Sequence, residues 1–144
     1  MRFILTADWH IRNTIPRCRL DNDWIDTQRK ALNQIVEKAI EKKCDVCVVG
    51  DIFHNNTDTT FECIKLVQDV AIALKKHDLK LYMLAGNHDL PYHSTENIKR
   101  SAIGLLLDSD NIYQLSELGD TVSAGNFDEE TEDKEIIFKH ILCF

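Results

Sequence analysis

Acidic, imidazole and amide side chains recur at three places in this chain, each time shortly after an apolar stretch. They are Asp8 and His10, then Asp51 and His54, then Asn87, His88 and Asp89. Side chains of these types suit hard or borderline divalent ions such as manganese, iron or zinc, and differ from the thiolates of a structural zinc site. The three clusters therefore indicate a metal centre.

The chemistry that such a centre performs follows from its carboxylates. One Asp can bridge two ions, and two ions roughly 3.5–4 Å apart can activate a water and clamp both the attacking and the leaving oxygen of a phosphoryl group. Hydrolysis of a phosphate ester is therefore expected. Gly50 and Gly86 precede two of the clusters and permit tight turns and close backbone approach. A single Asp or His at a strand end also has a plain interpretation as a turn former or helix cap, but three clusters together favour the metal centre.

Strands and helices alternate along the region that carries the clusters. Apolar runs predict buried strands at 3–5, 46–49 and 79–85, and apolar residues at helical spacing predict helices at 25–43 and 59–74. Thr59 and Glu62 have the spacing of a capping box at the start of the second helix. This α/β pattern, βαβαβ, predicts a parallel sheet whose strand ends meet at one edge. The three clusters then lie together, where ligands bind in such sheets.

The remainder of the chain predicts a further helix and short strands. The helix is expected at 95–108 and the strands at 112–115, 121–123 and 135–138, the last of them ending near His140. Neither proline lies at a change of composition, so nothing marks a domain boundary and residues 1–144 are expected to form one domain.

Composition is that of an ordinary soluble domain, with 44% hydrophobic and 28% charged residues. No apolar run is long enough for a membrane span or a signal peptide. Five cysteines, an odd number without framework spacing, suit reduced thiols, so an intracellular location (cytoplasm, nucleoid or nucleus) is expected. Cys44 and Cys47 are expected to pack in the core. The net charge of -7 argues against binding nucleic acid by bulk electrostatics, although bound divalent ions would supply a local positive field.

The three motifs together resemble a known family. The sequences D-W-H at 8–10, G-D-I-F-H at 50–54 and G-N-H-D at 86–89 are similar to those of the calcineurin-like metallophosphoesterase superfamily, and most of all to its Mre11 and SbcD nucleases of DNA repair. The resemblance covers nearly the whole chain. It implies the βαβαβ start of a sheet sandwich flanked by helices.

The resemblance also implies a set of metal ligands. Asp8 and His10 would bind the first ion, Asp51 would bridge both ions and Asn87 would bind the second. His140 matches the position of a later ligand of the second ion, with an ordinary strand-end histidine as the alternative. Manganese is the expected metal, with magnesium, iron and zinc as alternatives.

Two histidines have catalytic roles by the same resemblance. His88 would protonate the leaving oxygen, a role that suits imidazole near neutral pH. His54 would orient the phosphate or His88. Arg12, Arg17 and Arg19 follow the first motif and Lys99 and Arg100 follow the third; they are candidate contacts to DNA phosphates, although scattered surface basic residues are also common.

The family pattern ends with a Gly-His-x-His element that this sequence lacks. We therefore expect a truncated, N-terminal portion of the nuclease domain that lacks the second half of the sheet sandwich. The expected function is metal-dependent hydrolysis of DNA. The alternatives are a phosphatase or cyclic-nucleotide phosphodiesterase on the same scaffold, or a catalytically incomplete binding or assembly module. The resemblance further implies DNA, a second copy of the chain and an SMC-like ATPase of the Rad50 or SbcC type as partners. No membrane partner is expected, because no apolar run is long enough to span one.

Overall fold

A parallel β-sheet forms the centre of the molecule. The computed structural model describes residues 2–115 and 137–138, and in it the strands lie in the order β4-β3-β2-β1-β5 with every neighbouring pair parallel. The strands are β1 (Phe3–Thr6), β2 (Asp45–Val49), β3 (Leu81–Leu84), β4 (Ile112–Gln114) and β5 (Ile137–Phe138). The predicted α/β fold with its βαβαβ start is confirmed.

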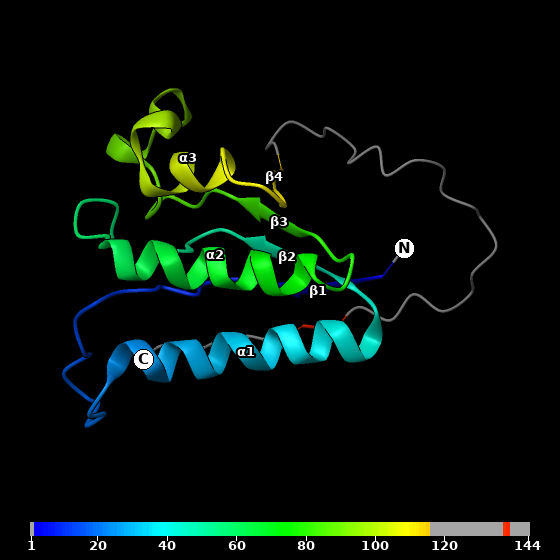
Figure 1. Ribbon diagram of the computed structural model, residues 1–144. Helices are drawn as coiled ribbons and strands as arrows, with labels where there is room; N and C mark the ends of the chain where they lie inside the picture. The colour runs from blue at the N-terminus through cyan, green and yellow to red at the C-terminus, as the bar shows by residue number, and fades with distance from the viewer. Residues whose placement is uncertain (1, 116–136, 139–144) are drawn as a thin grey trace.

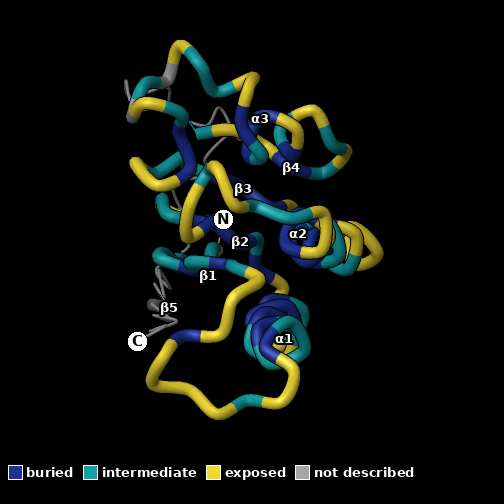
Figure 2. Tube along the Cα trace, turned by 90° about the vertical axis from the view of Figure 1, so that its left-hand side faces the viewer, coloured by how far each residue is buried: buried dark blue, intermediate teal, exposed yellow. Residues whose placement is uncertain are grey.

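Helices cover one face of this sheet. In both views α1 (Trp24–Lys42) and α2 (Phe61–Lys75) lie on the same side of the strands, and α3 (Ala102–Leu107) lies above β3, near β4 (Figures 1 and 2). The short 3-10 helices η1 (Pro91–His93) and η2 (Thr95–Arg100) lead from β3 to α3. No helix within residues 2–115 is both long and apolar enough to cross a membrane.

The strand register is fixed by a buried apolar row that crosses the sheet. Ile4, Val46, Leu81 and Ile112 are successive partners on β1, β2, β3 and β4, and all four are buried. A shift of one residue in any strand would turn its apolar side chains away from the core. The register therefore aligns the carboxyl ends of β1, β2 and β3 at one edge. Cys44 and Cys47 are buried, as expected for packing residues.

The start of α2 differs from the prediction. Thr60, in extended conformation, caps the helix by accepting a hydrogen bond from the Cys63 amide at 3.4 Å. The Thr59 hydroxyl instead donates to the Asn55 carbonyl at 2.7 Å. The predicted capping box with Thr59 as the cap is therefore wrong by one residue, because a loop contact takes up that hydroxyl.

The single helix predicted at 95–108 is also wrong, because the segment breaks at Ser101. Ser101 is extended, and its hydroxyl caps α3 by accepting from the Gly104 amide at 3.2 Å. A Cβ at Gly104 would lie only 2.1 Å from the Ile98 carbonyl oxygen, so α3 packs directly against η2 and cannot continue it. The strand predicted at 121–123 lies outside the described residues.

Candidate metal centre and active site

Loops that continue the strand pairing bring the three polar clusters together. Beyond β1 and β2, the His10 amide donates to the Asp51 carbonyl at 3.0 Å, and the Gly50 amide donates to the Leu84 carbonyl of β3 at 3.0 Å. An isolated parallel bridge joins Ile11 to the loop after β2. The predicted meeting of the strand ends at one edge is thereby confirmed.

Buried aromatic residues anchor these loops next to the polar ones. Trp9, between Asp8 and His10, is 2% exposed and donates from Nε1 to the Thr6 hydroxyl at 3.0 Å. Phe53 is fully buried beside His54 in the second loop. With these apolar side chains held in the core, the neighbouring polar side chains remain at the surface of the edge.

Three polar residues of the edge have left-handed backbone conformations. The φ angles are 54° at Asp8, 45° at His10 and 50° at Asp51. This region costs a residue with a Cβ roughly 1–2 kcal/mol. The surrounding hydrogen bonds hold these conformations, and such strain gathers at functional sites in proteins.

The same three residues form a candidate site for a cation. One ligand atom from each of Asp8, His10 and Asp51 lies within 4.8 Å of the other two. His10 Nε2 is 3.8 Å from Asp8 Oδ1, too far for a hydrogen bond. Two coordination bonds of about 2.1 Å can span up to about 4.2 Å, so one ion fits between these atoms. The donor set of two carboxylates and one imidazole also suits a divalent transition metal.

Two glycines let the loops after β2 and β3 approach each other. Gly50 has a φ of +81°, and a Cβ at Gly86 would lie 2.2 Å from both the amide nitrogen and Oδ1 of Asp51. Any side chain at Gly86 would displace Asp51. The predicted role of these glycines is confirmed, and the close approach lets the His88 amide donate to Asp51 Oδ1 at 3.2 Å.

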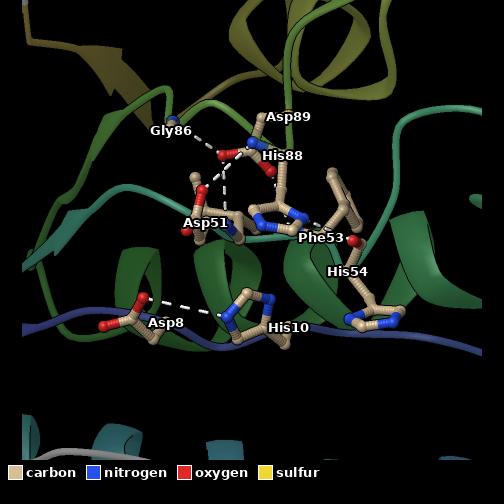
Figure 3. A network of polar contacts seen from close by, with 9 residues as sticks. Asp8, His10, Asp51, Phe53, His54, Gly86, His88 and Asp89 are labelled. Carbon is tan, nitrogen blue, oxygen red and sulfur yellow. Dashed lines mark hydrogen bonds and ion pairs between the residues drawn. The ribbon is translucent and has the colours of Figure 1, made fainter.

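Three imidazoles gather beside the carboxylates (Figure 3). The ring of His10 makes edge-to-face contacts with those of His54 and His88, with centroids 5.7 and 5.2 Å apart. His88 Nδ1 lies 2.9 Å from the His54 carbonyl oxygen. A carbonyl only accepts, so Nδ1 carries a proton and Nε2 is the nitrogen left to face a substrate.

A guanidinium completes this group of side chains. Arg12 Nη1 is 3.0 Å from His54 Nε2, and because a guanidinium only donates, this imidazole nitrogen accepts. Burial is the main cause that lowers the pKa of His54, and the neighbouring charges of Arg12, His10 and His88 lower it further. The neutral form of His54 is thus favoured beside the permanent positive charge of Arg12.

A comparison with protein families identifies the architecture. The family model described as calcineurin-like phosphoesterase matches residues 1–142. The chain belongs to the calcineurin-like phosphoesterase family. No curated protein matches the chain significantly. Family membership, together with the cluster of Asp8, His10 and Asp51, suggests metal-dependent hydrolysis of phosphoesters.

The other predicted residues of this phosphoesterase occupy different places. Asn87 is exposed at the same edge, next to His88. Among the arginines, Arg12 reaches the imidazoles, Arg17 is exposed in the loop after β1, and Arg19 pairs with Asp21 at 2.7 Å. His140 lies outside the described residues.

Asp89 has a role that the sequence did not reveal. Its side chain is only 1% exposed and accepts hydrogen bonds from the amides of Phe53 at 2.7 Å, Gly86 at 2.9 Å and Ile52 at 3.1 Å (Figure 3). Burial raises the pKa of Asp89, while these three hydrogen bonds act in the opposite direction. Asp89 therefore ties the loop after β2 to the loop after β3. The only sequence signal for this role was its place at the end of the G-N-H-D motif.

Proposed function

We propose that this phosphoesterase is a DNA nuclease of the Mre11 and SbcD type that works with manganese. One observation carries the proposal: a single sheet edge unites the cluster of Asp8, His10 and Asp51 with His88, whose ring is oriented by a backbone carbonyl. A cation site beside an oriented imidazole is what hydrolysis of a phosphodiester requires.

The carboxylates and His10 would hold the ions. In this proposal Asp8, His10 and Asp51 would hold the first ion, and Asp51, Asn87 and His140 would hold the second. When bound, the ions supply Lewis-acid polarisation of the phosphate and activation of the attacking water. The left-handed turns at Asp8, His10 and Asp51 set the backbone positions from which these side chains would hold the ions.

His88 would protonate the departing sugar oxygen. Its Nδ1–H is committed to the His54 carbonyl, so the proton for transfer is the second one, which the imidazolium form carries on Nε2. A fixed tautomer and ring orientation are what general acid catalysis needs, because the proton must lie within hydrogen-bond reach of the leaving atom.

The choice of DNA as substrate rests on the second motif and on Arg12. The G-D-I-F-H sequence at 50–54 resembles the second motif of the Mre11 nucleases, and His54 of this motif is hydrogen-bonded to Arg12. A guanidinium beside the imidazoles offers one backbone phosphate a charge-assisted hydrogen bond. Contacts of this kind position DNA without reading its sequence.

Hydrolysis assays with the metal-stripped chain plus Mn²⁺ test the proposal. Labelled DNA, bis(p-nitrophenyl) phosphate and p-nitrophenyl phosphate are compared for the wild type and for Asn87→Ala and His88→Ala. We expect manganese-dependent DNA cleavage that falls by about 10²-fold or more in both variants. His77→Ala, an exposed histidine after α2, is the matched control and should retain activity.

Each other outcome points to a different function. Cleavage of bis(p-nitrophenyl) phosphate without DNA cleavage would favour a phosphodiesterase for small substrates such as cyclic nucleotides. Cleavage of the monoester alone would favour a phosphatase. No bound metal and no hydrolysis would favour a binding or assembly module. Full nuclease activity in both variants would contradict the proposed roles of Asn87 and His88.

A further inference from the structure

A buried glutamine on α1 makes two hydrogen bonds to the backbone of the loop after β1. Gln28 is 5% exposed; its Oε1 accepts from the Arg12 amide at 2.9 Å and its Nε2 donates to the Arg12 carbonyl at 2.8 Å. The same Nε2 also donates to the Trp24 carbonyl within α1 at 3.2 Å. The side-chain amide thus satisfies both backbone groups of one loop residue, as a neighbouring strand would, and fixes the loop to the helix.

Arg12 and His54 connect Gln28 to His88 through successive hydrogen bonds. Arg12 Nη1 donates to His54 Nε2 at 3.0 Å, and the His54 amide donates to the Ile11 carbonyl at 3.1 Å. The His54 carbonyl then accepts from His88 Nδ1 at 2.9 Å. The ring of His54 is therefore held by Arg12, whose backbone Gln28 binds, and the backbone of His54 is held by Ile11, the residue before Arg12 in the loop.

We propose that Gln28 is a positioning residue for the proton donor of the reaction. It touches no substrate; it acts through Arg12 and His54 on the tautomer and ring orientation of His88. The inference rests on the proposed role of His88. Replacing Gln28 by Met keeps the size of the side chain but leaves the Arg12 amide and carbonyl without their partner, so the loop is free to shift. A displacement of about 1 Å at a catalytic group can lower a rate by about 10²-fold.

Substrates with different leaving groups distinguish a misplaced His88 from a general loss of folded protein. A p-nitrophenolate leaves readily without a proton, whereas a sugar or alkyl oxygen needs one. Gln28→Met should therefore lower kcat by about 10-fold or more on DNA, and by about 2-fold or less on bis(p-nitrophenyl) phosphate, from which p-nitrophenolate leaves. His88→Ala should show the same split, and the double variant should lose little more than His88→Ala alone because the two residues act as a unit.

Leu32→Val is the matched control, since Leu32 is also buried on α1 but lies in the apolar core. It should lower the melting temperature without any dependence on the leaving group. Equal losses on both substrates in Gln28→Met, as a general loss of folded protein would produce, would overturn the inference.

Imidazole nitrogen shifts measured by NMR give a second test that needs no activity. At a pH where the rings are neutral, wild-type His88 should be predominantly protonated at Nδ1, and Gln28→Met should shift His88 toward a mixture of tautomers. An unchanged tautomer in Gln28→Met would overturn the inference. If the wild type hydrolyses no phosphodiester, the proposed function fails, while the NMR experiment still decides whether Gln28 controls His88.

Discussion

The helix-covered face of the sheet and the edge where its strands end differ in burial, polarity and backbone conformation. Across the face run buried apolar side chains such as Val46 and Leu81, in regular strand conformations. At the edge, Asp8 and Asp51 have left-handed backbones and His88 is exposed. Burial of apolar area stabilises the fold, whereas strained and exposed polar groups do not. The face therefore provides stability, whereas the strained polar residues at the edge lower it and form the candidate site.

Among variants that test this difference between face and edge, the largest change in activity is expected at Asp51. Asp51→Gly removes a candidate metal ligand but suits the φ of 50°, which glycine adopts without steric strain. Hydrolysis should fall on the order of 10³-fold, while the free energy of unfolding, measured by urea denaturation, should stay within about 1 kcal/mol of the wild type.

Leu81→Ala on the face is the reciprocal variant. It should cost about 2–5 kcal/mol of unfolding free energy and leave the activity per folded molecule unchanged. A stability loss above about 2 kcal/mol in Asp51→Gly would show that the edge also holds the fold together, and the comparison would fail.

Asp89 is the residue at the edge that should behave like a core residue. Asp89→Ala leaves the amides of Ile52, Phe53 and Gly86 buried without their acceptor, so we expect a loss of about 2–5 kcal/mol. Asp89→Asn keeps one accepting oxygen and should lose less. Denaturant titrations measure both, and a loss below about 1 kcal/mol in Asp89→Ala would contradict the structural role.

A smaller loss of stability is expected from variants at the start of α2, one of the helices that cover the face. Thr60→Ala removes the helix cap and should cost about 1 kcal/mol, whereas Thr59→Ala removes only a loop hydrogen bond and should cost less. Thermal melts of the two variants provide the check. The reverse order would restore Thr59 as the cap.

The smallest expected effect is a difference in reactivity between the thiols of Cys18 and Cys47. Burial raises the pKa of Cys47 from 9.0 to about 11, so its thiol stays protonated well above neutral pH, while Cys18 is exposed. Iodoacetamide at pH 8–9, followed by mass spectrometry, should modify Cys18 before Cys47. Because the folded pKa lies above the unfolded one, the thiol's contribution to stability is present below about pH 9 and is lost as the pH rises toward about 11. Equal labelling of both cysteines would show that β2 opens readily.

The sheet and its ligand-bearing edge were predictable because their signals are local. Apolar runs predict strands, helical spacing predicts helices, and each cluster directly follows its own strand. The same periodicity could not place the break at Ser101, where the close contact between Gly104 and Ile98 decides the backbone. It also could not choose between Thr59 and Thr60 as the cap.

The supporting residues of the site were not predictable from patterns within one element. Asp89 is buried because amides from two loops converge on it, and those of Ile52 and Phe53 lie 37 and 36 residues away in the chain. Gln28 resembles any polar residue of a surface helix until the fold brings Arg12 against it. Such hydrogen bonds between distant segments leave no periodic trace in the sequence.

Metal binding tests the central claim most directly. Calorimetric titration of the metal-stripped chain with Mn²⁺ compares the wild type with Asp8→Asn and Asp51→Asn, which keep side-chain size and a conformation that Asn tolerates. We predict that the wild type binds manganese and that each variant binds at least about tenfold more weakly, with His77→Ala unchanged. Equal affinity in the wild type and both Asn variants, or no binding by the wild type, would contradict the account.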